Sequence, residues 1–491
     1  MKWLMQGFNT TASVDHPKLY KVITVTAGRS LNSSILREYD IRGTVGATLV
    51  SDDVLAIGRG FGSVVANEFG RGASVAVGYD GRLSSPNLFS ALTDGLIQSG
   101  IKVINVGLGP TPMIYFATHQ TSSHAGMMIT GSHNPPTFNG IKMVLGGRPF
   151  YGNDIQSLGV RVKNGEYVNG RGVMEEIDVR DQYVDRLLEG NQWQSKIKVG
   201  WDPGNGAAGE IISRIIEKID GEHFLINGNI DGNFPNHHPD PTVEENLLQL
   251  KKLVSEKDCD VGIGFDGDGD RIGVIDSQGR VIWADQLMVI WARDVLERLP
   301  GSTIIADVKT SAVFYDQVKK AGGNPVMWKT GHSLIKSKMA ELNAPLAGEM
   351  SGHIFFADEY YGFDDAMYAA LRLLRILTRG GVRLDELKDK LPFMFNTPEL
   401  RFVCADEKKF AIVDLVRQRL KSGGKADICE IDGVRVETEY GWWLLRASNT
   451  QPALVARCES NSEDGLAQLK GELGEQLMLN GIDPVNLFNS I

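Results

Sequence analysis

The sequence has few cysteines, no long apolar run and no excess of basic residues. The four cysteines among its 491 residues, Cys259, Cys404, Cys429 and Cys458, are scattered and form no CxxC pair. This pattern disfavours a disulfide framework or a zinc site and favours reduced thiols in a cytoplasmic protein. No apolar run reaches the roughly 18 residues that cross a bilayer. Polar residues at 9–11 interrupt the start, so we expect neither a membrane span nor a secretory signal.

The sequence has fewer basic than acidic residues. Lys and Arg total 51 against 61 Asp and Glu, a formal net charge of −10. Such a balance excludes nucleic acid and anionic membranes as expected main partners. A small anionic substrate would need locally concentrated Arg and Lys. Hydrophobic residues at 42% and charged residues at 23% are typical of a globular protein.

Common cofactor and hydrolase motifs are also missing. The sequence contains no GxxxxGK[ST] loop, HExxH or GxSxG. The segment 204–209 resembles a dinucleotide-binding fingerprint, because it is glycine-rich and lies between a predicted strand and a predicted helix. That fingerprint also needs an acid at the end of the next strand, where this chain has Asn227. We therefore reject nicotinamide binding.

Glycine, in contrast, is abundant, with 56 residues. Segments 73–80, 196–203 and 302–308 each predict a short strand followed by a polar loop and an amphipathic helix. In the first of these units, Ser85 is the predicted N-cap and Gly100 the predicted stop of the helix. Alternating strands and helices at a spacing of about a hundred residues predict several related α/β domains.

The last hundred residues follow another pattern. A predicted hairpin at 431–436, strands at 442–445 and 453–457, and a closing helix at 466–479 indicate an α+β module. The chain length is compatible with three or four domains.

The strongest chemical motif lies between two predicted strands. Asp266, Asp268 and Asp270 alternate with glycines, and three carboxylates so close together repel one another unless a cation lies between them. The spacing lets them converge on a hard dication. An EF-hand is excluded, because its sixth and twelfth positions would be Arg271 and Ser277 instead of Gly and Glu.

In a second motif, Ser132 lies between Gly131 and His133 and is followed by the two rigid prolines at 135–136. This arrangement suits a nucleophile, and Lys142 suits a proton acceptor or a phosphate contact. A simple turn whose polar side chains satisfy backbone groups fits the residues equally well.

Two further loops carry polar side chains suited to a sugar phosphate. The guanidinium, hydroxyls and amide of Arg446, Ser448, Asn449 and Thr450 follow a predicted strand and suit a phosphate. Within 348–353, Glu349 and Ser351 would face one way if the segment were extended, matching two sugar hydroxyls. An ordinary polar turn remains the alternative there.

Together, these motifs closely resemble the α-D-phosphohexomutase superfamily, most closely its bacterial phosphomannomutase/phosphoglucomutase branch. The resemblance spans residues 31–491 and is carried by segments 39–43, 130–136, 266–271, 328–333, 349–353 and 446–450, together with Lys309. It implies three related α/β domains with mixed sheets plus a C-terminal α+β domain around a central cleft. We expect an N-terminal extension at 1–30 and domains at 31–178, 179–280, 281–395 and 396–491.

The resemblance also implies the chemistry. Ser132, as phosphoserine, would exchange a phosphoryl group with a hexose 1-phosphate or 6-phosphate through a 1,6-bisphosphate, which also serves as activator. Ser132 and the three aspartates would hold Mg²⁺, with Arg271 beside them. Lys142 and His332 are the candidates for general acid and base, with the assignment open. Other implied substrate contacts are Tyr39, Arg42, Lys309, Glu349, Ser351, His353, Arg446, Ser448, Asn449 and Thr450.

Met350 is similar to the residue of enzymes that accept both mannose and glucose, so we expect both sugars as substrates. A phosphoglucosamine mutase, a phosphatase with Asp266 as nucleophile, and a sugar-phosphate-binding protein without turnover are the alternatives. We expect a cytoplasmic monomer or weak dimer.

Overall fold

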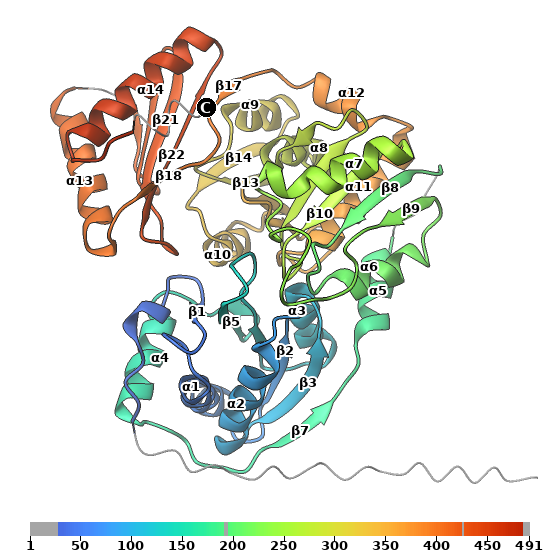
Figure 1. The fold of residues 1–491 in the computed structure, drawn as a ribbon, viewed down its shortest axis with the longest axis vertical. Coiled ribbons are helices and arrows are strands. Elements are labelled where there is room, and N and C mark those ends of the chain that lie inside the picture. The colour runs from blue at the N-terminus through green and yellow to red at the C-terminus, as the bar shows by residue number, and fades with distance from the viewer. Residues whose placement is uncertain (1–27, 191–194, 425–426, 485–491) are drawn as a thin grey trace, which may run out of the picture.

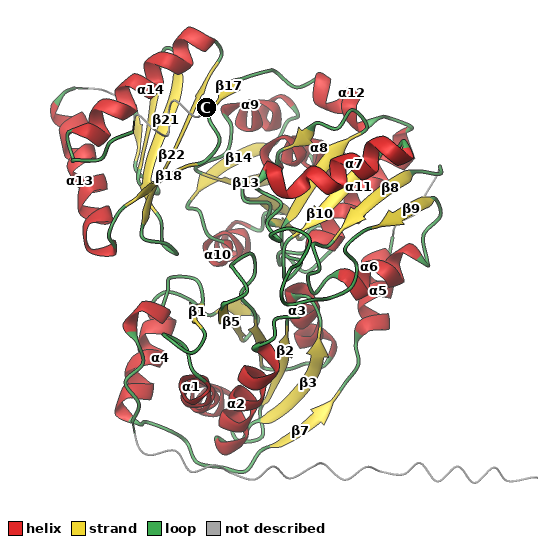
Figure 2. Ribbon diagram, viewed as in Figure 1, coloured by secondary structure: helices red, strands yellow, loops and turns green. Residues whose placement is uncertain are grey.

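The computed structural model describes residues 28–190, 195–424 and 427–484. The predicted extension at 1–30 therefore falls, up to residue 27, outside the described residues. Over those ranges the chain folds into four β-sheets, each flanked by helices, and the sheets define domains 1 to 4 in chain order (Figures 1 and 2). None of the helices in these ranges has the length and apolar character needed to cross a membrane.

Domain 1 forms the lower lobe of Figure 1. Its sheet has the strand order β1-β5-β4-β2-β3-β7, and β6 pairs with β5. The strands are β1 (Ile41–Thr44), β2 (Ser74–Tyr79), β3 (Lys102–Leu108), β4 (Ala125–Ile129), β5 (Phe138–Leu145), β6 (Arg148–Pro149) and β7 (Val173–Glu176). The helices are α1 (Ser51–Phe69), α2 (Ser85–Gln98), α3 (Thr111–Gln120) and α4 (Asn153–Asn164), with a 3-10 turn at Ser33–Ile35.

Domain 2 has the strand order β12-β11-β10-β8-β9. Its elements are α5 (Arg180–Leu188), β8 (Lys198–Asp202), α6 (Gly209–Ile216), β9 (Glu222–Leu225), a 3-10 turn at Glu244–Leu247, α7 (Leu248–Lys257), β10 (Val261–Phe265), β11 (Ile272–Asp276) and β12 (Val281–Ile282). Strands β8, β9 and β10 are parallel, whereas β11 runs antiparallel to β10. The turn between β10 and β11 carries the predicted metal ligands.

Domain 3 has the strand order β14-β13-β15-β16. Its elements are α8 (Ala284–Arg298), β13 (Thr303–Asp307), α9 (Ala312–Lys320), β14 (Asn324–Trp328), α10 (His332–Leu342), β15 (Leu346–Gly348), β16 (Ile354–Phe356), α11 (Ala366–Gly380) and α12 (Leu384–Asp389). Like the first two sheets, this one is mixed, because β16 runs antiparallel to β15.

Domain 4 lies at the upper left of Figure 1 and is built on an antiparallel sheet. Its strand order is β17-β22-β21-β20-β19, with β18 also pairing with β22. The elements are β17 (Phe395–Asn396), β18 (Leu400–Val403), α13 (Asp406–Ser422), β19 (Ile428–Cys429), β20 (Val434–Thr438), β21 (Gly441–Ala447), β22 (Ala453–Ser460) and α14 (Glu463–Met478). The predicted fold class is confirmed.

Buried apolar side chains connect the domains unequally. One continuous core joins α3 of domain 1 to the sheets of domains 2 and 3. Domain 4 keeps a separate core and meets domain 3 through a small cluster around Val308, Trp442 and Leu444. Because buried apolar area supplies most of the packing free energy, domains 1 to 3 are joined more firmly than domain 4.

The predicted start of the second helix is wrong by one residue. Helix α2 begins at Ser85, its N-cap is Ser84, and the Ser85 hydroxyl instead donates to Asp80 Oδ1 at 2.6 Å. Gly100 follows the helix with a φ of +80°, a conformation that glycine adopts without strain, so the predicted stop is correct.

Candidate active site

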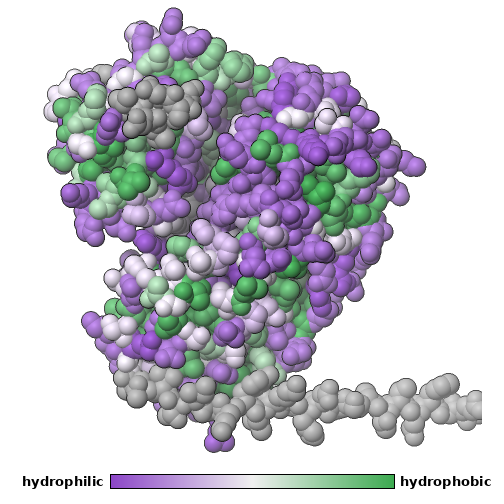
Figure 3. Space-filling view, in the orientation of Figure 1, coloured by the Kyte–Doolittle hydropathy of each residue, from purple (hydrophilic) through white to green (hydrophobic). Residues whose placement is uncertain are grey.

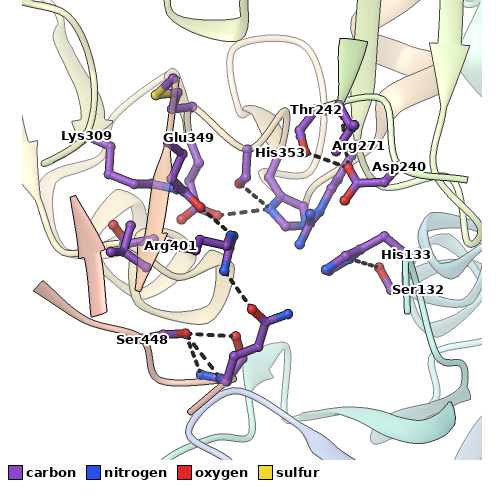
Figure 4. A pocket seen from close by; sticks show the side chains of 18 of the residues that line it. Ser132, His133, Asp240, Thr242, Arg271, Lys309, Glu349, His353, Arg401 and Ser448 are labelled. Carbon is purple, nitrogen blue, oxygen red and sulfur yellow. Dashed lines mark hydrogen bonds and ion pairs between the residues drawn. The ribbon is translucent and has the colours of Figure 1, made fainter. Parts of the chain in front are cut away.

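A cavity of about 820 Å³ lies where the four domains meet (Figure 4). In the space-filling view a hollow opens between domains 1 and 4 (Figure 3). The predicted site residues that line the cavity are Tyr39, Arg42, Ser132, Lys142, Arg271, Lys309, His332, Glu349, Ser351, His353, Arg446, Ser448, Asn449 and Thr450. Asp266, Asp268 and Asp270 are fully buried and lie behind Ser132.

Ser132 lies in the loop between β4 and β5. Its φ of +49° is uncommon for a residue with a side chain, and its backbone N–H donates to Thr130 Oγ1 at 2.8 Å. The Ser132 hydroxyl donates to Asp266 Oδ2 at 2.8 Å and lies 3.2 Å from His133 Nδ1. The loop therefore presents the hydroxyl to the carboxylates of domain 2 while it still lines the cavity.

The fully buried side chain of Arg82 holds this loop in place. Its guanidinium donates to the carbonyl oxygens of Ser132 at 2.7 Å, Asn134 at 2.6 Å, Pro135 at 2.6 Å and Phe138 at 3.0 Å. Its Nε pairs with Asp80 at 3.1 Å. Sequence reasoning missed this function, because nothing local to Arg82 shows that its acceptors lie about 50 residues further along the chain.

We predict that Arg82→Met lowers the free energy of unfolding by at least about 3 kcal/mol, because the buried Asp80 carboxylate loses its charged partner and the loop carbonyls lose their guanidinium donors. Chemical denaturation monitored by circular dichroism measures the change. Arg148→Met is the matched control, since the Arg148 guanidinium donates to the Pro149 carbonyl at 3.3 Å and forms an exposed pair with Asp154, a type of ion pair that contributes at most about 1 kcal/mol. Equal stability of the two variants would contradict the assigned function of Arg82.

The acidic loop, which comprises residues 266–271 between β10 and β11, contacts domain 1. Carboxylate oxygens of Asp266, Asp268 and Asp270 lie within 4.8 Å of one another. A Cβ at Gly267 would lie 2.5 Å from the Ser132 carbonyl oxygen, so only glycine permits this approach. On the other side, Thr111 at the start of α3 donates its backbone N–H to the Asp268 carbonyl at 2.8 Å.

Lys142 is the cation that this cluster holds in the structure. Its ammonium lies 2.7 Å from Asp268 Oδ2 and also contacts Asp270. Burial alone would lower the pKa of Lys142, but the two carboxylates outweigh it and hold that pKa well above its usual range. Burial and the neighbouring carboxylates raise the pKa of Asp266, as expected where like charges converge.

The three aspartates of the acidic loop fit a metal cofactor. Asp268 Oδ1 is buried and has no hydrogen-bond donor among the described residues, an arrangement that costs free energy unless a ligand satisfies the atom. Three carboxylates without sulfur or nitrogen donors suit a hard dication. The aspartates are therefore the candidate metal ligands, as the sequence predicted.

The segment at 349–352 is a turn between β15 and β16, so of the two possibilities that the sequence left open, the polar turn is found and the extended segment is not. Gly352 N–H donates to the Glu349 carbonyl at 3.0 Å, because the hairpin register pairs Gly348 with Ile354. Glu349 Oε1 accepts from Gly331 N–H at 2.5 Å, and Oε2 lies 3.0 Å from His353 Nδ1. Ser351 Oγ lies 3.2 Å from the same His353 nitrogen.

His353 connects this turn with the acidic loop. Its Nε2 lies 3.2 Å from Asp270 Oδ1 and 3.3 Å from Arg271 Nε, and residues 271 and 353 form an antiparallel bridge. Burial lowers the pKa of His353, but Asp270 and Glu349 outweigh it and raise that pKa to about 9. His332 differs, because burial and Lys336 lower its pKa, which favours the neutral imidazole.

The loop after β21 lies across the cavity from Ser132 (Figure 4). Arg446 Nε donates to Asp432 at 3.0 Å, which leaves the far end of the guanidinium for a ligand. Asn449 Nδ2 donates to the Tyr39 hydroxyl at 2.6 Å, and that hydroxyl donates to the Thr330 carbonyl, also at 2.6 Å. Tyr39 thus links domain 1 to domains 3 and 4.

Other cavity residues were not predicted from the sequence. Among them are Asp40, His133, Asp240, Glu399, Arg401, Gln451 and Arg457. Glu399 pairs with Lys309 at 2.8 Å, and Arg457 donates to the Lys309 carbonyl at 2.6 Å. No local motif marks Glu399 and Arg457, since their contacts with Lys309 form only when domain 4 meets domain 3.

A serine beside buried carboxylates, facing a basic loop across a cavity shared by four domains, is the arrangement of a phosphoryl-transfer protein. Four models of the phosphoglucomutase/phosphomannomutase family match most of this chain: α/β/α domain I at residues 33–168, domain II at 181–279, domain III at 283–394 and the C-terminal domain at 399–476. The chain belongs to this family.

Individual relatives agree. The chain is 43% identical over 449 residues to a phosphomannomutase/phosphoglucomutase of Pseudomonas aeruginosa, covering 91% of this chain and 96% of that protein. It is 40% identical over 445 residues to a phosphoglucomutase of Neisseria gonorrhoeae, covering 90% and 96%. A crystal structure of a family protein from Burkholderia thailandensis superposes with a TM-score of 0.86 at 42% identity, covering 91% of this chain and 97% of that one.

Proposed function

We propose that this chain is a phosphohexomutase that interconverts hexose 1-phosphates and hexose 6-phosphates, with mannose and glucose as the sugars. The phosphoryl group moves between Ser132 and the substrate through a hexose 1,6-bisphosphate, which also restores the phosphorylated enzyme. This function extends to the chain what the names of its relatives state of those proteins.

One observation carries the proposal. The Ser132 hydroxyl lies 2.8 Å from Asp266 Oδ2 although the two residues belong to different domains. It lines the same cavity as Arg446 and the polar loop that follows it. A nucleophile on one wall and a phosphate-binding loop on another suit a substrate that carries phosphate at either end.

In the proposed first step, the Ser132 Oγ–P bond breaks and a bond forms between phosphorus and the free sugar hydroxyl. The hydroxyl proton passes to a base in the cavity and Ser132 Oγ gains a proton, for which Lys142 and His332 are the candidates. Mg²⁺ bound by the three aspartates and Ser132 would supply charge stabilisation for the transferring group. The second step reverses this chemistry at the other end of the sugar.

Glu349 and Ser351 would accept or donate hydrogen bonds at sugar hydroxyls that mannose and glucose share, and Lys309, Tyr39, Arg42 and His353 would contact the rest of the substrate. Met350 lies between Glu349 and Ser351 in the sequence, and its sulfur is 2.9 Å from Arg457 Nη1. We also propose the domain division 31–178, 179–280, 281–395 and 396–491. The strands support it with two exceptions at the boundaries: β12 (Val281–Ile282) pairs in the sheet of domain 2, and β17 (Phe395–Asn396) crosses the boundary at 395 and pairs in the sheet of domain 4.

Arg446→Gln should raise KM for the hexose phosphate by about tenfold or more while kcat changes little, because the phosphate that is not transferred is bound alike in ground and transition states. Steady-state kinetics measure the split. Arg417→Gln is the control, since Arg417 is a partly exposed residue of α13 in the same domain that pairs with Asp414 and Glu430 and does not line the cavity. An unchanged KM in Arg446→Gln would remove Arg446 from the phosphate site.

A coupled assay tests the function itself. Mannose, glucose and glucosamine 1-phosphates are supplied in turn, with Mg²⁺ and a catalytic amount of the matching bisphosphate. Turnover of the mannose and glucose compounds is expected. Turnover of the glucosamine compound alone would establish a phosphoglucosamine mutase, and binding without turnover would establish a non-enzymatic protein.

A further inference from the structure

A carboxylate in the cavity separates two cations that come from different domains. Glu399, in the connection between β17 and β18, lies 2.8 Å from Lys309 Nζ through Oε2, and its Oε1 pairs with Arg401. Lys309 belongs to domain 3, whereas Arg401 lies on β18 of domain 4. Burial alone would raise the pKa of Glu399, but the nearby cations Lys309, Arg401 and Arg446 outweigh it and lower that pKa to about 2.

Arg401 lines the cavity next to the loop at 446–450, which is the proposed phosphate loop. Its Nη1 donates to Gln451 Oε1 at 2.8 Å, and the Gln451 backbone N–H donates to Ser448 Oγ at 3.1 Å. In Figure 4 the Arg401 side chain projects between Lys309 and Ser448. Strand β18 exposes every second residue, which places Arg401 on the outer face while Leu400 and Phe402 enter the core of domain 4.

We propose that Arg401 is a second guanidinium of the phosphate site, and that the substrate phosphate replaces Glu399 as its partner. This inference rests on the proposed function and adds to it a residue that the sequence motifs do not contain. A guanidinium forms paired hydrogen bonds to phosphate as readily as to carboxylate. Half of the Arg401 side chain is exposed (51%), so it exchanges partners without the loss of core contacts.

The exchange has a direct electrostatic reason. Without substrate, Glu399 neutralises cations that would otherwise repel one another around an open cavity. A phosphate dianion brings more charge and more acceptor atoms than one carboxylate. Glu399 therefore competes with the substrate phosphate for these cations. Its negative charge lowers the affinity of the enzyme for the substrate, whereas the positive charge of Arg401 raises that affinity.

Three variants of the full-length enzyme test the proposal. Arg401→Gln should raise KM for the hexose 1-phosphate about tenfold with kcat within about twofold. Arg401→Lys should give an intermediate KM, because it keeps the positive charge and loses the paired N–H donors of the guanidinium. Glu399→Gln should lower KM, since it removes the competing anion. Arg417→Gln is the control for general charge loss in domain 4.

The contrary results are equally distinct. An unchanged KM in Arg401→Gln, or a fall in kcat alone, would overturn the binding function of Arg401. An unchanged or raised KM in Glu399→Gln would overturn the exchange and make Glu399 a residue that positions its cations. Thermal unfolding midpoints equal to wild type exclude a folding defect as the cause.

A binding measurement separates this proposal from the proposed function. Hexose 1-phosphate is titrated calorimetrically into Ser132→Ala and into the double variant with Arg401→Gln, which should bind about tenfold more weakly. Equal affinities would overturn the function of Arg401 while leaving turnover by the unmodified enzyme unaffected. Weaker binding by the double variant, in a chain that fails the coupled assay, would sustain the phosphate contact and overturn only the mutase activity.

Discussion

Ser132→Ala is expected to abolish turnover of hexose phosphates, with a loss of kcat of at least about a thousandfold. The substitution removes the oxygen that carries the phosphoryl group and the donor of the 2.8 Å hydrogen bond to Asp266. The Ser132 hydroxyl both lines the cavity and donates to the acidic cluster, whereas the Thr111 hydroxyl contacts the cluster without lining the cavity. The coupled assay measures the loss.

Ser90→Ala is the matched control for this experiment, since Ser90 lies on the exposed face of α2 in the same domain. It should retain full activity. Ser90→Ala should unfold at the temperature of the wild type, and Ser132→Ala should remain folded with a loss of about 1–3 kcal/mol in the free energy of unfolding for the missing hydrogen bond. Substantial turnover by Ser132→Ala would remove Ser132 from the reaction and, with it, the proposed phosphoserine.

Asp268→Asn is expected to lower kcat on the order of a thousandfold and to remove the dependence of stability on Mg²⁺. Asp268 contributes a buried oxygen with no hydrogen-bond partner among the residues described, so its loss weakens the site where a metal has most to gain. In the wild type, Mg²⁺ should raise the unfolding temperature, because a ligand that binds only the folded state stabilises it.

Asp414→Asn, on the exposed face of α13, controls for the loss of one carboxylate. Treatment with a chelator should inactivate the wild type and this control, and Mg²⁺ should restore both. If Asp268→Asn kept full activity and the same Mg²⁺-dependent rise in unfolding temperature, Asp268 would not be a metal ligand.

The rival assignment of Asp266 as an aspartyl nucleophile fits the structure poorly. Asp266 is fully buried, does not line the cavity, and accepts a hydrogen bond from Ser132, which stands between it and the cavity. A nucleophile must reach its substrate, and only the serine hydroxyl does so. That both mannose and glucose are substrates is a prediction, which follows because the groups proposed to contact the sugar do not distinguish the two at position 2.

The sequence predicted the parts of the site that local spacing determines. Asp266, Asp268 and Asp270 lie within five residues of one another, and the strands on either side of them are β10 and β11. Ser132 was recognisable from its glycine and proline neighbours. The three strand–loop–helix units were predictable because apolar periodicity is a local property of the chain.

Other features depend on contacts that spacing does not reveal. Arg82 meets carbonyls about 50 residues away, and Glu399 meets Lys309 across 90 residues. Of the two conformations considered for 349–352, the turn is found because the pairing of β15 with β16 imposes it. These contacts arise from the register of sheets and from the meeting of domains, which a pattern along one segment does not contain.

The most direct test of the account locates the phosphate on the enzyme. The protein is incubated with hexose 1,6-bisphosphate and Mg²⁺, digested, and analysed by mass spectrometry before and after acid treatment. The account predicts one acid-stable phosphate on Ser132 that a hexose monophosphate removes. An acid-labile phosphate on Asp266, or full turnover with Ser132 never phosphorylated, would contradict it.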